Sequence, residues 1–308
     1  MGAGAYVYAY DEMRRGINMN NKALFVCVLA GSCATVACDD MDIDFGGGPK
    51  VETPFHYSYD VKPGGRLELE TFNGSVEIRS WDQNKVDVSG TKSAGTAALN
   101  ALIKIDSHAT ADGVEVRAIH PNEHHGNMGV RFVVRVPHSF ELDRITSSNG
   151  QVKVEDLDGA VRVHTSNGGI HLSQIKGNVD ATTSNGAIEL NELNGRAVLS
   201  TSNSHIQGDH LSGPVDATTS NGSINIAFAT PPKSDIHAET NNSSIEISMP
   251  ESSAVRVRAS TSNSSITSDF DVDKSGTVSK DHLEGTIHGG GPMLDLHTSN
   301  GSIRLAKP

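Results

Sequence analysis

The sequence contains one stretch that is rich in metal-ligating side chains, the hexapeptide HPNEHH at residues 120–125. Imidazole nitrogens and a carboxylate bind zinc when the backbone brings them together. The spacing of His120, His124 and His125 matches no standard zinc site, and Pro121 and Gly126 indicate an exposed loop. These histidines are therefore weak metal candidates, and we predict that the protein carries no metal and no other cofactor.

Ser, Thr and Asn recur through the second half of the chain, where such lines could supply nucleophiles or contact sugars. The chain has no Gly-x-Ser-x-Gly elbow and no repeat-consistent His or Asp beside a Ser. Parallel β-helix enzymes that act on polysaccharides cluster carboxylates on one face. Here Asp180 and Asp216 share a column with Arg162 and Val198. We interpret the polar lines as solvated corners and strand faces and predict no enzyme; a β-helix carbohydrate-active enzyme is the less favoured alternative.

The polar lines belong to an internal repeat, which dominates the sequence. A turn-like tetrad of Ser, Thr, Asn and Gly recurs with gaps of 18, 18, 18, 18, 21, 21 and 37 residues between successive asparagines. The last gap is close to two units and predicts one coil that has lost its motif. The repeat-corner asparagines are Asn149, Asn167, Asn185, Asn203, Asn221, Asn242, Asn263 and Asn300.

Apolar residues follow the same spacing. One column consists of Val161, Val179, Ala197 and Val215, and within each unit apolar residues alternate with polar ones, as expected for half-buried strands. Each unit therefore predicts a strand, an Asn-containing corner, a second strand and a Leu-x-Gly corner. Asn and Gly tolerate the positive φ of tight corners, which we expect to explain why they recur together.

Two all-β architectures fit this pattern. Asn-Gly between alternating strands is typical of β-hairpins, so an antiparallel hairpin array is one alternative. We favour a parallel β-solenoid with coils of about 18 residues, because four successive gaps without insertion keep identical side chains in register. In such a stack the Asn side chains could bond to each other along the column.

The first 38 residues have the features of a signal peptide. Lys22 precedes the apolar run Ala23–Ala30, which is too short to span a bilayer. The segment ending at Cys38 resembles a bacterial lipobox, with Cys33 as the alternative lipidation site; an ordinary cleaved signal is the other interpretation. We interpret the residues before Met19 as a start-site artefact or an extended n-region.

The remaining chain divides into three parts. Residues 39–50, rich in Asp and Gly, predict a flexible tether. Residues 51–140 predict a β-rich N-terminal cap over the first coil, and residues 141–308 predict the repeat solenoid, interrupted at 269–291 by charge and glycines. All three cysteines lie in the first 38 residues, so the folded part has no disulfide.

The phrase Thr-Ser-Asn-Gly-Ser-Ile and the C-terminal run GGGPMLDLHTSNGSIRL resemble a bacterial adhesin-like family of β-strand-repeat proteins, domain of unknown function 4097. The resemblance covers about residues 60–308. It implies a β-solenoid on exported or membrane-tethered proteins, and it supplies no catalytic residues.

Composition limits the partners. A formal charge of −12 without a basic stripe excludes nucleic acid. We therefore predict a non-catalytic, exported cell-envelope protein, periplasmic or on the cell surface, that binds an envelope protein or surface glycan as an adhesin-like or scaffold module. Its contact with the membrane is expected only through the lipid anchor. An accessory or sensory subunit of an envelope complex is the alternative.

Overall fold

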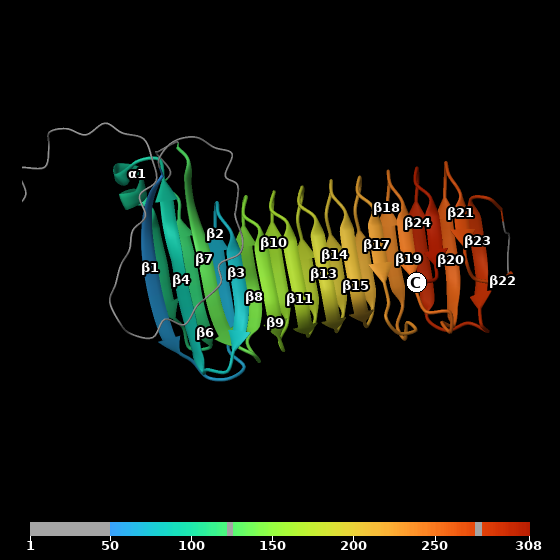
Figure 1. The fold of residues 1–308 in the computed structure, drawn as a ribbon, viewed down its shortest axis with the longest axis horizontal. Coiled ribbons are helices and arrows are strands. Elements are labelled where there is room, and N and C mark those ends of the chain that lie inside the picture. The colour runs from blue at the N-terminus through green and yellow to red at the C-terminus, as the bar shows by residue number, and fades with distance from the viewer. Residues whose placement is uncertain (1–49, 122–125, 275–278) are drawn as a thin grey trace, which may run out of the picture. The chain divides into compact units, whose positions relative to one another are not determined.

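The structure, a computed structural model, describes residues 50–121, 126–274 and 279–308. The predicted signal peptide, most of the predicted tether, His124 and His125 lie outside these residues. The described part consists of two β-sheets and one short helix, α1 (Ala97–Leu102), which begins at the N-cap Thr96. Figure 1 shows the strands stacked side by side along the chain, from β1 at one end to β22 at the other.

The two sheets contain 12 and 13 strands, which we call sheet A and sheet B. In spatial order, sheet A consists of β1 (Val51–Asp60), β4 (Lys85–Ala94), β7 (Met128–Pro137), β3 (Val76–Trp81), β9 (Val152–Leu157), β11 (Ile170–Lys176), β13 (Ile188–Asn194), β15 (Ile206–Ser212), β17 (Ile224–Ala227), β19 (Ile245–Ser248), β25 (Ile303–Ala306) and β21 (Ile266–Ser268). Sheet B consists of β22 (Asp273–Lys274), β23 (His282–Ile287), β20 (Val255–Thr261), β24 (Met293–Thr298), β18 (Ile236–Thr240), β16 (Val215–Thr218), β14 (Ala197–Ser200), β12 (Val179–Thr182), β10 (Val161–Thr165), β8 (Glu141–Ser147), β2 (Arg66–Thr71), β6 (Gly113–Ile119) and β5 (Lys104–Ala109).

Consecutive strands of the repeat alternate between the sheets, so one strand of each sheet makes one coil. Val179 of β12 pairs in parallel with Val161 of β10 and with Ala197 of β14, each one 18-residue unit away. Ile188 of β13 pairs in the same way with Ile170. The prediction of a parallel β-solenoid is therefore confirmed, and the hairpin array is excluded for the repeat.

The core lies between the two sheets. Inward side chains alternate with outward ones along each strand, so that Val179 and Ala181 of β12 face Ile188 and Leu190 of β13, and all four are at most 2% exposed. One continuous cluster of such aliphatic residues runs through all coils. Each buried side chain contributes about 1.5–3 kcal/mol, which is why the stack is stable without disulfides.

Part of the expected N-terminal cap belongs to the stack itself. β2 pairs in parallel with β8, and β3 pairs in parallel with β9, so β2 and β3 form a coil of the same kind as the repeats. β6 and β7 follow later in the chain but form the next coil outward, also in parallel. Antiparallel pairing at this end is restricted to β1, β4 and β5, which close the two sheets.

The C-terminal end also departs from chain order. β24 and β25 lie between the coil of β18 and β19 and the coil of β20 and β21, and they pair in parallel with both neighbours. Figure 1 shows β24 placed between β18 and β20. No coil has therefore lost its motif in the 37-residue gap. That gap contains an excursion through β21, β22 and β23, in which β23 runs antiparallel to β20, followed by a return into the stack.

Glycine recurs at the Asn corners for a reason that we did not predict. Among the described corner glycines only Gly74 has a positive φ. A Cβ at Gly168 or Gly186 would lie 1.9 or 1.8 Å from the carbonyl oxygen of the glycine one coil earlier, so these two corners stack too closely for a side chain. Three other coils carry serine at the equivalent position, Ser204, Ser243 and Ser264. Positive φ angles occur instead at the opposite corner.

Candidate functional site

The repeat-corner asparagines form one ladder along the edge of the stack, which we call the upper corner. Each amide Nδ2 donates to the Oδ1 of the asparagine in the preceding coil of the stack at 2.5–2.9 Å. Asn300 lies between Asn242 and Asn263, in agreement with the inserted C-terminal coil. The ladder also includes Asn73, a ninth member whose signal in the sequence is the degenerate corner Phe72-Asn73-Gly74-Ser75.

A column of threonines lies directly beneath this ladder. Thr183 is 3% exposed; its Oγ1 donates to the Gly168 carbonyl at 3.1 Å and accepts from the Gly186 N–H at 3.2 Å. Thr165 and Thr298 make the same pair of bonds in their own coils. The prediction that these hydroxyl groups are solvated is therefore wrong. They are buried and join each corner to its neighbour, so they are not free to act as nucleophiles.

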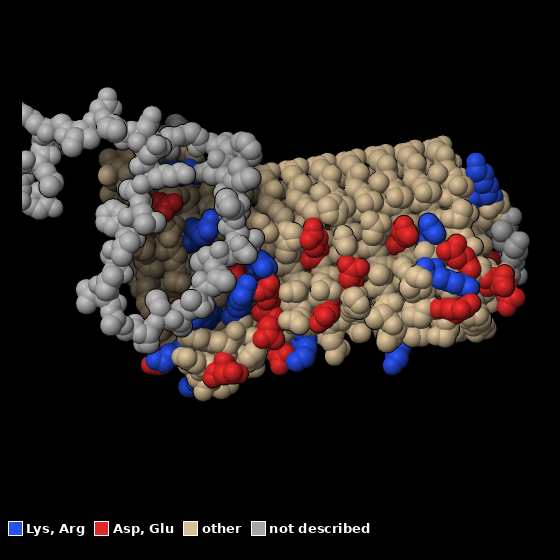
Figure 2. Space-filling model, viewed as in Figure 1, with Lys and Arg blue, Asp and Glu red and all other residues tan. Residues whose placement is uncertain are grey.

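No charged side chain is visible at the upper corner of the repeat coils (Figure 2). Figure 2 shows that its edge over the repeat coils presents no Lys, Arg, Asp or Glu side chain, whereas charged groups gather lower on the same face. The amide groups are already engaged with each other along the ladder. We therefore assign the asparagines a structural role in stacking.

The opposite edge, which we call the lower corner, contains four residues with left-handed backbone. Asp156, Gln174, Glu192 and His210 follow each other at 18-residue intervals with φ between 55° and 59°, and all four side chains are exposed. The backbone bulges at these positions, which the parallel register skips. Since a side chain disfavours left-handed backbone by about 1–2 kcal/mol per residue, these positions are strained.

A shallow groove of about 380 Å³ runs along the lower corner. Its floor contains Ile175 and Leu193, which are 1% and 2% exposed, and its walls include the four left-handed residues. The Nζ atom of Lys176, also in the wall, lies 3.0 Å from Asp158 Oδ1. This hydrogen bond raises the pKa of Lys176 above its usual value, so the ammonium group stays charged.

Ser80, His138 and two aspartates meet at the N-terminal end of this corner. Ser80 Oγ lies 2.7 Å from His138 Nδ1 and donates to Asp156 Oδ2 at 3.1 Å, and His138 Nε2 lies 3.3 Å from Asp82 Oδ1. These are the groups of a nucleophilic triad, and the sequence did not reveal them because they lie outside the repeat spacing. The Asp82 side chain is 100% exposed, so water competes for the imidazole. The arrangement is that of a solvated cluster that ties β3 to β9.

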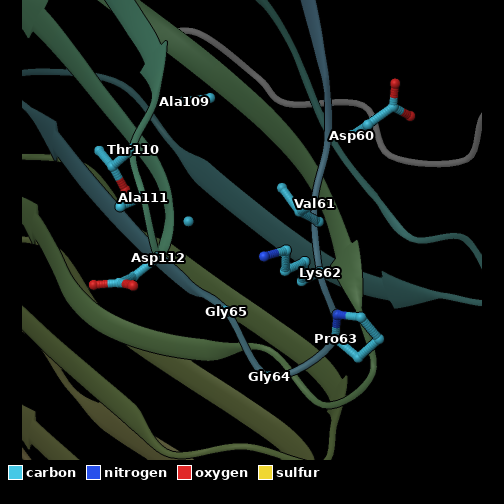
Figure 3. A pocket seen from close by; sticks show the side chains of 11 residues that line it. Asp60, Val61, Lys62, Pro63, Gly64, Gly65, Ala109, Thr110, Ala111 and Asp112 are labelled. Atoms are coloured by element: carbon cyan, nitrogen blue, oxygen red, sulfur yellow. The ribbon is translucent and has the colours of Figure 1, made fainter.

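A second pocket, of about 400 Å³, lies between the β1–β2 turn and the β5–β6 turn. Figure 3 shows the Lys62 ammonium group extending into the space between the two turns, while the Asp112 carboxylate points away from it. That carboxylate accepts from Arg66 at 2.8 Å and raises the pKa of its guanidinium group. One ammonium group and the Thr110 hydroxyl could contact a small anion, but they supply no acid–base pair for catalysis.

Of the predicted metal and lipidation residues, the structure describes only His120. His120 packs edge-on against Phe72, with ring centroids 4.8 Å apart, and the described residues contain no group of three metal-ligating side chains. Cys33 and Cys38 lie outside the described residues. Within the part that the structure covers, no helix has the length and apolarity to cross a bilayer.

Comparison with curated proteins finds no match. Comparison with solved structures finds a candidate adhesin of Bacteroides fragilis at 13% identity and a TM-score of 0.42, covering 83% of this chain and 97% of the other. A candidate adhesin of Parabacteroides merdae (8%, 0.35; 82% and 95% covered) and a candidate cell adhesion protein of Clostridium sporogenes (11%, 0.28; 83% and 100% covered) are also similar. The family model Toastrack DUF4097 matches residues 64–306, so this chain belongs to that family.

Proposed function

We propose that this protein is a non-catalytic, exported component of the bacterial cell envelope that binds a partner through the repeated surface of its coils. It acts as an adhesin-like interaction or scaffold module. The partner is an envelope protein or a surface glycan.

The observation that carries this proposal is the repetition of outward-facing groups in register. On the outer face of sheet B, Thr182, Ser200 and Thr218 pair across β12, β14 and β16, so the same hydroxyl recurs once per coil, about every 4.8 Å. A surface of this kind offers many equal weak contacts, which sum to a useful affinity when the partner is itself repetitive. The polar clusters of the described residues are open to water, which supports binding rather than catalysis.

Binding is tested with the full-length protein and isolated bacterial envelopes. Cell walls and membranes are separated, titrated with the protein and sedimented, and the bound fraction is measured against protein concentration. We expect saturable binding to one of these fractions. Binding to both fractions that stays linear with concentration, or that equals the binding of an unrelated protein of similar charge, would contradict the proposal.

We further propose that Cys38 carries a lipid anchor, with Cys33 as the alternative. The features that support this are the apolar run Ala23–Ala30 and the small residues before Cys38. The variant Cys38→Ala should move the protein from the membrane to the soluble fraction after cell lysis, and Cys33→Ala should not. An unchanged membrane fraction for Cys38→Ala would contradict anchoring at this residue.

A further inference from the structure

We propose that the lower-corner groove is a binding site for a linear, neutral glycan that lies along the stack across successive coils. This inference rests on the proposed function, because it names the ligand class and the part of the repeated surface that holds it. The two corners of each coil differ in the hydrogen bonding of their side chains.

At the upper corner the side-chain amides are hydrogen-bonded to each other along the stack. At the lower corner several polar side chains have no partner among the described residues. Every asparagine of the upper ladder is bonded to its neighbours through its side-chain amide. In contrast, the side chains of Gln174, Glu192 and His210 make no hydrogen bond or ion pair to any other described residue. They are exposed along the wall of the groove, at equivalent positions of successive coils.

The backbone at these positions points to a use for the side chains. A glycine adopts a φ of 55–59° without the penalty that Gln174, Glu192 and His210 carry there. The corner could therefore be built at lower cost with a glycine at each of these positions. Strained backbone positions cluster at active sites and ligand-binding sites, so we infer that these side chains contact a ligand.

The groove matches the surface of a sugar chain in chemistry. A carboxylate, a primary amide and an imidazole can each accept or donate hydrogen bonds to hydroxyl groups. Ile175 and Leu193 also line the groove but are only 1% and 2% exposed, so the contacts to a sugar chain come from the polar side chains of its walls. The carboxylates of Asp156 and Glu192 repel a polyanion, and the ammonium group of Lys176 is already paired with Asp158, so among glycans an uncharged, hydroxyl-rich chain fits best.

The dimensions favour a chain over a single sugar. The groove extends from Asp156 to His210, which are three coil spacings apart, and each spacing is about 4.8 Å. The wall groups repeat with that spacing, so a ligand with repeating hydroxyl groups engages several coils at once. Contacts that are weak individually then add along the chain.

The experiment titrates the full-length protein with chitohexaose and with cellohexaose, using isothermal calorimetry, and repeats the titrations with the corresponding monosaccharides. The test variants are Glu192→Gly and Gln174→Ala. The matched control is Gln207→Ala, which removes an exposed glutamine from the outer face of sheet A, away from the groove. We expect saturable binding of at least one hexasaccharide and much weaker binding of its monosaccharide.

Each groove variant should weaken that binding about tenfold, the loss of one hydrogen bond to a charged or strongly polar group, while the control stays within about twofold. Thermal unfolding distinguishes this loss from damage to the fold. Glu192→Gly should unfold at the same temperature as the native protein or higher, because glycine relieves the strained backbone.

Three results would overturn the inference: neither hexasaccharide binds, both groove variants bind as tightly as the control, or oligolysine binds in their place with an affinity that falls steeply with salt. The failure of the proposed function is separate. If the native protein and both groove variants bind envelope fractions equally and saturably, the module binds elsewhere and only the groove assignment falls.

Discussion

The buried threonine column predicts that two adjacent substitutions will have very different effects. Thr183 and Thr182 are neighbours at the end of β12, but Thr183 is buried at 3% exposure whereas the Thr182 side chain lies on the outer face of sheet B. Valine has nearly the shape of threonine and lacks the hydroxyl. Thr183→Val should therefore destabilise the protein, while Thr182→Val should not.

The magnitude follows from the two hydrogen bonds of Thr183. Its hydroxyl donates to the Gly168 carbonyl and accepts from the Gly186 N–H, so valine leaves a carbonyl and an N–H of the corner without this partner. Each lost bond costs about 0.5–1.5 kcal/mol, and a buried donor left unpaired costs about 1–3 kcal/mol. We expect a total near 2 kcal/mol, which corresponds to about 4–8 °C in the unfolding temperature. Thr182→Val should change stability by less than about 0.5 kcal/mol.

The assay is thermal and urea unfolding of the full-length protein, followed by circular dichroism and compared as shifts of the transition midpoint. Midpoint shifts remain useful if the coils unfold in more than one step, as stacks of repeats can do. The reasoning is refuted if Thr183→Val unfolds at the native temperature, or if both variants lose the same amount. Either result would mean that the hydroxyl bonds do not hold the corners together.

Ile188→Asp should unfold the middle of the stack, because this side chain is fully buried and an unpaired charge would enter an apolar column. Glu189→Lys on the outer face loses the 2.8 Å contact with His171 and should cost no more than about 1 kcal/mol. Equal loss of dichroism signal from both would contradict the inward and outward assignment. Gly186→Ala should lower the unfolding midpoint, because its Cβ would lie 1.8 Å from a carbonyl oxygen of the preceding coil; a native midpoint would argue against such close corners. The hydrogen bond from Lys307 lowers the pKa of Glu251 below its usual value. The stabilisation that this ion pair gives to the folded state is therefore present above the usual carboxyl pKa, and it is lost as the pH falls through the lowered pKa. The small stability difference between the native protein and Glu251→Gln, both groups being exposed, should thus vanish on acidification; a difference that grows in acid would contradict this pairing.

The architecture of the repeat could be predicted because one spacing governs several kinds of residue at once. Val161, Val179 and Ala197 recur with the asparagines, and only a parallel stack keeps all of these columns in register. The inward and outward alternation within each strand follows from the two-residue period of β-structure. These features are local and repeat without interruption, so a single sequence is sufficient to reveal them.

The order of the coils at both ends could not be predicted. β24 and β25 pair with coils on either side, and their sequence fits the slot between β19 and β21 as well as it fits a position after them. Periodicity records which residues are equivalent and carries no information on which coil lies next to which. After a long excursion such as that through β22 and β23, the sequence therefore does not predict which coils are adjacent in space.

The chemistry of the corners was predicted in part. The bonding between stacked asparagines follows from their register, but the burial of Thr183 depends on how tightly neighbouring corners approach. The left-handed backbone at Glu192 left no sequence signal, since glutamate is an unusual residue for that conformation. A strained position with an unexpected residue is found only in coordinates.

The placement of β24 and β25 has a consequence for how the chain matures. Residues 293–306 follow β20–β23 in the chain but fill the layer beneath them, so β20 and β21 have no parallel partner until these residues arrive. A chain that is still emerging from a ribosome can assemble its earlier coils but leaves both sheet edges open at this layer. Completion of the fold thus requires residues 293–306, and a chain cut before Met293 would lack an internal layer instead of a dispensable end.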